Sequence, residues 1–163
     1  MLLNRLGKKL MFFDGGMGTL LQEKGLPVGE LPESWNITHP ETIKDIHKAY
    51  FDAGSNVVCT NTFGANLLKF EKDELENVIT SAVSIAKQAK EESKGAQEKF
   101  IALDIGPLGK LLKPLGDLEF EKAVEKWNDT YCPDEFRRAW GECGANESLV
   151  MVLNYKGYVK YYM

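Results

Sequence analysis

The stretch "MFFDGGMGTLLQ", residues 11–22, joins an apolar run to an aspartate and three glycines. Its first half, with Lys9 and Leu10 before it, predicts a short buried strand over residues 9–13. Two explanations of the loop after this strand compete. The loop is either a phosphate cradle, or it presents bare backbone to a small polar ligand.

The chain beyond this loop alternates between helix and strand signals. An apolar helical face over residues 40–54 is followed by the strand "NVVCTNTF" and by a helix over about residues 73–94. The strand "FIALDIGPLG" comes next, and Asp117 is placed to cap the helix after it. Thr38 and Glu41 have capping-box spacing, and Gly95 is expected to end the second helix. Strands that are apolar without alternation, connected through helices, predict a parallel sheet covered by helices.

Polar residues gather where each predicted strand ends. These clusters are Asp14-Gly15-Gly16, Thr60-Asn61-Thr62, and Asp104 before Gly106-Pro107. In parallel α/β folds the carboxyl ends of the strands form the edge at which ligands bind. The sequence therefore predicts one ligand site built from all three clusters.

The chemistry of the first loop favours a zwitterionic ligand over a phosphate. The loop lacks the Gly-x-Gly-x-x-Gly order of a dinucleotide site and the Gly-Lys-Ser/Thr of a P-loop, and no acid ends the second strand. A simple tight turn would explain the glycines but not Asp14. A carboxylate beside exposed amides suits a ligand whose ammonium meets the acid and whose carboxylate meets the backbone.

The composition excludes several classes of protein. The chain has 163 residues, 44% of them hydrophobic and 27% charged, with a net charge of −4, so neither a nucleic-acid partner nor a membrane surface is expected. The chain has three cysteines, an odd number, and their spacing is not that of a small disulfide-bonded domain, which argues against a disulfide scaffold. We expect a cytoplasmic protein.

Three motifs carry a family resemblance. "DGGMGTLLQ", "LPESWNITHPETIKDIHKAYFDAGSNVVCTNTFGAN" and "DIGPLGKLLKPLGDLEFEKA" resemble, in order and spacing, the first half of the homocysteine S-methyltransferase domain. The likeness is strongest to the N-terminal homocysteine-binding module of cobalamin-dependent methionine synthases. It implies a partial (β/α)₈ TIM barrel of about three to four βα units. Residues 1–125 would form the N-terminal half, and residues 126–163 a divergent or truncated tail.

The resemblance also implies an activity. Members of this family transfer a methyl group to the homocysteine thiol in methionine biosynthesis, with a zinc ion on the sulfur. Asp14, Gly15 and Gly16 match the loop that holds the amino-acid end of homocysteine, and three further positions lie at the barrel mouth: Asn61, Thr62 and Asp104. No catalytic residue is assigned. Cobalamin and methylfolate are expected to bind only to other modules. The implied partners of this chain are homocysteine and either those modules or a complementing chain.

The chain departs from the family in its metal ligands. The family's zinc cysteines, in a Gly-x-Asn-Cys stretch and a Cys-Cys pair, are missing, and "LVMVL" does not end in the expected glutamate. Cys59, Cys132 and Cys143 lack the spacing of a replacement set, so no metal ligand is predicted. His47 is interpreted as a packed core residue. A non-catalytic barrel fragment with at most residual homocysteine binding is therefore the alternative to a methyltransferase module, and its open sheet edges predict poor solution behaviour or pairing with another chain.

Overall fold

The computed structural model describes residues 8–131, 149–153 and 159–162. Helices and strands follow one another in the order α1 (Met17–Glu23), η2 (Pro32–Ser34), α2 (Trp35–Thr38), α3 (Pro40–Asp52), β1 (Val57–Cys59), α4 (Lys72–Glu92), β2 (Phe100–Ile105), α5 (Phe120–Tyr131), β3 (Leu149–Leu153) and β4 (Val159–Tyr162). None of the described helices is long and apolar enough to span a membrane.

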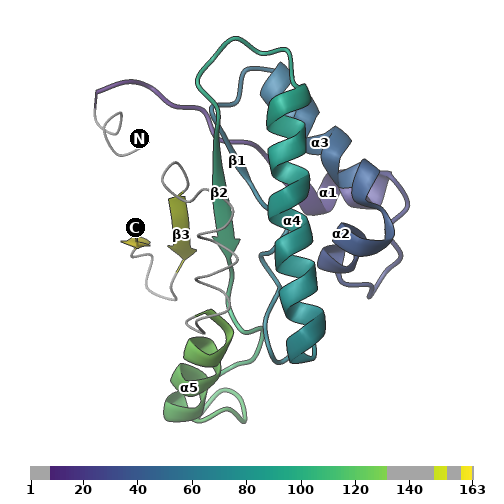
Figure 1. Cartoon of the computed structure of the whole chain (residues 1–163). Coiled ribbons are helices and arrows are strands. Elements are labelled where there is room, and N and C mark those ends of the chain that lie inside the picture. Colours follow the sequence, from purple (N-terminus) through teal and green to yellow (C-terminus); the bar gives the residue numbers. More distant parts are fainter. Residues whose placement is uncertain (1–7, 132–148, 154–158, 163) are drawn as a thin grey trace.

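The strands form one partial sheet in the order β1-β2-β3-β4 (Figure 1). β1 and β2 pair in parallel with Cys59 opposite Ala102, and β2 and β3 pair in parallel with Asp104 opposite Met151. The predicted α/β class and parallel pairing are confirmed, and β3 is the strand expected from "LVMVL". β4 was not expected, and it pairs antiparallel with β3.

Helices α3 and α4 cover one face of this sheet (Figure 1). Val58 and Ile101 pack with Phe51 and Ala86, while Leu103 and Ile105 face the apolar side of α4. The alternate residues face away from these helices and form a second apolar cluster of Val57, Phe100 and Ala102, with Met11 and Cys59 against it. Both faces of β1 and β2 are thus apolar, which explains why the strands show no alternation.

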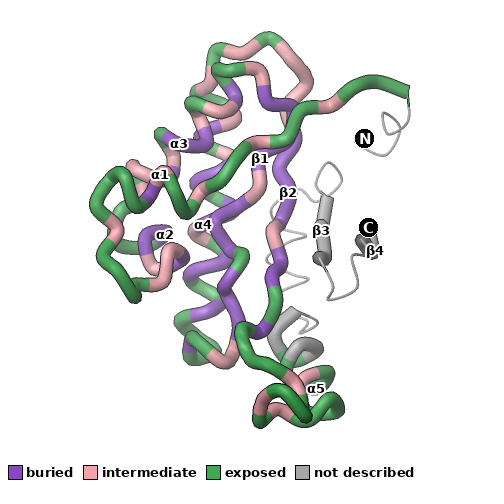
Figure 2. The backbone as a smooth tube through the Cα atoms, turned by 180° about the vertical axis from the view of Figure 1, so that it is seen from behind, coloured by how far each residue is buried: buried purple, intermediate pink, exposed green. Residues whose placement is uncertain are grey.

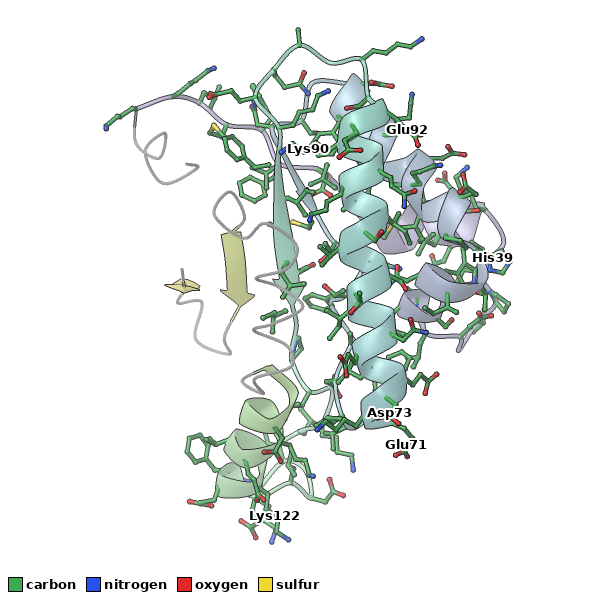
Figure 3. The ribbon with its side chains drawn as sticks, viewed as in Figure 1. His39, Glu71, Asp73, Lys90, Glu92 and Lys122 are labelled. Carbon is green, nitrogen blue, oxygen red and sulfur yellow. The ribbon has the colours of Figure 1, made fainter. Side chains whose placement is uncertain are left out.

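The long central helix α4 confirms the predicted helical face. All six residues expected on that face are buried: Val78, Ile79, Ala82, Val83, Ala86 and Ala89. Its charges also suit the helix dipole, because Asp73 lies in the first turn and Lys90 in the last, at opposite ends of the helix in Figure 3. Glu92 ends the helix and pairs with Lys44 of α3 at 3.4 Å, which links the two helices at that end.

Helix α3 buries the histidine that was interpreted as a core residue. His47 is fully buried, and burial lowers the pKa of its imidazole to about 4. Neither ring nitrogen has a hydrogen-bond partner. The ring is therefore neutral at physiological pH and serves as a packing residue on the same face as Ile43, Ile46 and Phe51.

The prediction of a buried strand over residues 9–13 is wrong in extent and in burial. Only Phe13 forms a bridge, parallel to Val57, and Phe12 and Phe13 are 58% and 42% exposed. The segment still follows β1, since the backbone N–H of Val57 donates to the carbonyl of Phe12 at 3.1 Å. Figure 2 shows this exposed segment passing the buried strands. Within the described residues, the segment has a neighbouring strand on one side only, so it gains little regular pairing.

Two predicted helix ends are also wrong. Thr38 is the last residue of α2, and its hydroxyl donates to the carbonyl of Ser34 at 3.3 Å; it does not cap α3, whose N-cap is His39. α4 leaves helical geometry at Ser93. Gly95 is needed for a close approach, because a Cβ there would lie 2.5 Å from the carbonyl oxygen of Phe51.

A pair of glycine substitutions tests the packing at the strand ends. A Cβ at Gly106 would lie 2.2 Å from the carbonyl oxygen of Phe63, which itself accepts the Gly106 N–H at 3.0 Å. We expect Gly106→Ala to lower the free energy of unfolding by roughly 2–3 kcal/mol, since backbone must move to admit the methyl group. Urea denaturation measures the change.

Gly18 is the matched control, because it lies within α1 and its Cβ position has nothing within 4 Å. Gly18→Ala should be neutral or stabilise the fold by up to about 1 kcal/mol through helix propensity. Equal losses for the two variants would contradict the close contact at Gly106.

Candidate functional site

The ends of the first segment, β1 and β2 bring Asp14, Cys59 and Asp104 to one edge of the sheet. The N–H of Asp14 donates to the carbonyl of Val57 at 2.9 Å, and Asp14 Oδ2 accepts the N–H of Cys59 at 2.9 Å. Cys59 is opposite Ala102 in the β1–β2 register, and Asp104 lies two residues further along β2. Because side chains alternate along a strand, Asp104 projects from the same face as Ala102, away from α4.

Two threonines fix the backbone around Asp104. The hydroxyls of Thr60 and Thr62 are 2.7 Å apart. Thr62 donates to the carbonyl of Asp104 at 2.7 Å, and the N–H of Asp104 donates to Thr60 Oγ1 at 3.3 Å. Thr62, a predicted substrate-binding residue, is thus buried and holds the end of β1 against the end of β2.

Asn61 lies at the same edge but points toward the segment before α3. Its amide donates to the carbonyl of Pro32 at 2.7 Å and to Asn36 Oδ1 at 3.1 Å. Asn36 donates in return to the carbonyl of Asn61 at 2.8 Å. The side chain of Asn61 therefore anchors the 32–36 segment to the end of β1.

Gly15 and Gly16 connect Asp14 to helix α1. A Cβ at Gly15 would lie 2.8 Å from the hydroxyl of Tyr50, so the phenol occupies the space that a side chain would need. Gly16 is the N-cap of α1. The pKa of Tyr50 is raised by burial and by the charge of Asp14, which keeps the hydroxyl protonated beside the loop.

The electrostatics of the site disfavour negative charge. Burial raises the pKa of Asp14, although the N–H of Cys59 opposes this effect. The pKa of Asp104 is raised to about 6 by burial and by the charges of Asp14 and Glu33. Burial and the two aspartates also raise the pKa of the Cys59 thiol. A cation placed at this edge would favour the ionised forms and so oppose all three shifts.

Glu33 belongs to this edge but was not among the predicted site residues. It is only 4% exposed, and its Oε1 accepts the N–H of Gly64 at 2.6 Å. Its Oε2 is buried without a hydrogen-bond partner. The available signal was its place within "LPESWN", one of the motifs that carry the family resemblance.

The described residues do not fit a zinc site. In that part of the chain no group of three or more His, Cys, Asp or Glu side chains could hold a metal ion. Cys59 is partly buried, and the pKa of its thiol is shifted away from the thiolate that zinc binds. Cys132 and Cys143 lie outside the described residues.

Comparison with known proteins gives concordant matches. The family model described as homocysteine S-methyltransferase matches residues 11–137. The chain is 30% identical over 140 residues to a methionine synthase of Mycobacterium leprae and 32% identical over 130 residues to one of Mycobacterium tuberculosis, covering 79% and 73% of this chain. A homocysteine S-methyltransferase of Zea mays is 30% identical over 90 residues.

The solved structures show the same fold. The homocysteine methyltransferase MmuM from Escherichia coli, in its metallated form, aligns with a TM-score of 0.70 at 21% identity over 96% of this chain. The alignment covers 59% of MmuM, and the sequence matches span 12% and 11% of the two mycobacterial proteins and 26% of the maize protein.

The raised pKa of Asp104 predicts a stability change with a definite pH dependence. Because its folded-state pKa of about 6 exceeds the ordinary value of 3.8, the stabilising contribution of the protonated form is present at low pH and is lost as pH rises from about 4 to 6. Asp104→Asn should therefore be more stable than the wild type at pH 7, by roughly 1–2 kcal/mol after allowance for solvent screening.

Urea denaturation at pH 4 and pH 7 measures this effect, and the gain should shrink toward zero at pH 4. Asp117→Asn is the matched control, since Asp117 is exposed and lies outside the cluster. A stability difference that does not change with pH would contradict the assigned cause.

Proposed function

We propose that this chain, which belongs to the homocysteine S-methyltransferase family, binds homocysteine at the carboxyl ends of its strands as part of a methyltransferase module for methionine biosynthesis. The observation that carries the proposal is the partly buried carboxylate of Asp14. The Cys59 N–H holds this carboxylate in place, and its charge adds to burial in raising the pKa of the neighbouring Asp104. Burial also raises the pKa of Asp14 itself. The ammonium of an amino-acid ligand would supply the positive charge that favours the ionised carboxylates.

Each predicted site residue has a proposed part in this binding. Asp14 accepts the ammonium of homocysteine, and the backbone of Gly15 and Gly16 faces its carboxylate. Thr62 and Asn61 act by holding the strand ends and the 32–36 segment in place. Asp104 completes the acidic side of the site. The thiol would then project along the inner face of the sheet, toward the remaining elements of the fold.

We also propose that the parallel strands are the beginning of a (β/α)₈ barrel. The parallel bridge at Phe13, the pairing of β1 with β2 and of β2 with β3, and the covering helices support this architecture. In it, residues 1–125 form three βα units, and residues 126–163 are a divergent segment that includes the antiparallel β4. Modules that bind cobalamin and methylfolate, or a complementing chain, are the proposed partners in the cytoplasm.

A second function remains a specific alternative, namely homocysteine binding without methyl transfer. It is favoured by Cys59, the one cysteine of the described residues, because its thiol resists the ionisation that a zinc ligand requires. The two functions differ in a direct assay. A methyltransferase module converts homocysteine to methionine when supplied with a methyl donor and zinc, whereas a binding fragment only retains homocysteine.

The role of Asp14 is tested by Asp14→Asn. Asparagine still offers an oxygen to the Cys59 N–H but removes the charge that an ammonium needs. A charge-assisted hydrogen bond contributes about 1.5–3 kcal/mol, so the affinity for homocysteine should fall about ten- to hundred-fold. Isothermal titration calorimetry measures the affinity, and the thermal midpoint should be nearly unchanged.

Asp45→Asn is the control, since it removes one negative charge from an exposed position of α3. It should leave the affinity unchanged. A large drop of the thermal midpoint for Asp14→Asn, with homocysteine affinity intact, would make Asp14 a structural residue and refute its binding role.

A further inference from the structure

The residue after Asp14 is a glycine for reasons of space and not of backbone conformation. Gly15 is not among the glycines of positive φ in the described part of the chain. A Cβ at Gly15 would instead lie 2.8 Å from Tyr50 Oη and 3.4 Å from the ring atoms Cε1 and Cζ. The first distance is shorter than a Cβ contact in a folded protein, so the Tyr50 hydroxyl excludes a side chain at this position.

The ring of Tyr50 is held in place by packing. It lies in the last turn of α3 and packs against two clusters of the core, one that includes Ile43 and one that includes Phe51. A tyrosine ring is rigid, and close packing on both sides leaves it little freedom to rotate. The hydroxyl is therefore a fixed stop for the loop and does not swing aside as the end of a flexible side chain would.

The contact at Gly15 bears on Asp14 because the two residues are adjacent in the chain. On its other side, Asp14 donates its N–H to the carbonyl of Val57 at 2.9 Å and accepts the Cys59 N–H at 2.9 Å. The pKa of Tyr50 agrees with this placement, since burial and the charge of Asp14 raise it, while a hydrogen bond with the backbone of Gly15 lowers it. The loop is thus held between β1 and the hydroxyl on α3.

We propose that Tyr50 is a positioning residue of the candidate site, which sets the place of the Asp14 carboxylate through its contact with Gly15. The inference rests on the proposed homocysteine site and adds to it a residue of α3 that helical spacing alone gives no reason to single out. The hydroxyl does not touch the ligand. It acts by keeping the loop at a fixed distance from α3, so that the charge of Asp14 meets the ammonium.

A double-mutant cycle of Gly15 and Tyr50 tests this contact. Gly15→Ala should displace the loop, because the methyl group does not fit against the hydroxyl. Tyr50→Phe removes the hydroxyl and leaves ring carbons at 3.4 Å as the nearest Tyr50 atoms, which is ordinary van der Waals contact. The double variant should therefore recover most of what Gly15→Ala loses, whereas two independent losses would add.

Amide hydrogen exchange reports the place of Asp14 without any ligand. The Cys59 N–H is bonded to Asp14 Oδ2. The next amide of the chain, that of Thr60, is bonded instead to the carbonyl of Ala102 at 2.9 Å. Exchange of the Thr60 amide is therefore the internal reference, because it follows the opening of the sheet and not the position of the loop.

In Gly15→Ala, the Cys59 amide should exchange about tenfold faster relative to that of Thr60, as expected for one lost hydrogen bond. Adding Tyr50→Phe should restore most of the protection. If both amides accelerate equally, or if the double variant exchanges faster at Cys59 than Gly15→Ala does, the inference is overturned.

The affinity for homocysteine should follow the same cycle. Gly15→Ala should weaken binding about tenfold in isothermal titration calorimetry, the lower end for a lost charge-assisted hydrogen bond, and the double variant should regain most of this loss. Gly18→Ala is the matched control, since nothing lies within 4 Å of its Cβ position. It should change neither the affinity nor the exchange at Cys59.

The outcomes separate this inference from the proposed function. If homocysteine does not bind the wild type but the Cys59 amide follows the cycle, the proposed function fails and the positioning of Asp14 by Tyr50 is supported. If Gly15→Ala lowers the urea midpoint but keeps homocysteine affinity within about twofold, Tyr50 serves only in packing. That result would overturn the inference and leave the homocysteine site intact.

Discussion

The hydrogen bond from the N–H of Cys59 to Asp14 Oδ2 is the interaction on which the candidate site depends. The backbone pairing between the first segment and β1 is limited to the bridge at Phe13, with the bonds from Asn56 and Val57 to the carbonyl of Phe12 and from Asp14 to the carbonyl of Val57. The side chain of Asp14 replaces the next backbone acceptor and so extends the contact by one step. It orders the glycine loop against the strand, and it places the carboxylate where the parallel strands end.

The same arrangement brings together acids that repel one another. Asp104 shows the consequence most clearly, since its pKa is raised by burial and by two neighbouring carboxylates. Such a cluster lowers the stability of the free protein, because burial and mutual repulsion oppose the ionised carboxylates. The threonine pair at residues 60 and 62 fixes the backbone of Asp104 through its carbonyl and its N–H and leaves its carboxylate without a threonine donor.

The sequence predicted the parts of the fold that depend on long periodic patterns. Helix α4 and its buried residues, the apolar face of α3, and the parallel pairing of β1 with β2 follow from the spacing of apolar residues alone. Short elements were missed, since α1 buries only Leu21 and offers no periodicity to detect. The cap at Thr38 failed because Thr38 still belongs to α2, and His39 is the residue that precedes α3.

The candidate site was predictable where its residues follow strands, and not where they come from a loop. Asp14 and Asp104 end apolar runs, so their place at the sheet edge follows from topology. Glu33 reaches the same edge because Gly64 has no side chain, and only tertiary packing brings this glycine beside an acid 31 residues earlier. From the family resemblance, a glutamate is expected at the end of the fourth strand, but this chain has Asn154 after "LVMVL". Because asparagine is neutral, the acids that the described residues place at this edge are Asp14, Asp104 and Glu33, and Glu33 is the one whose place no strand pattern could reveal.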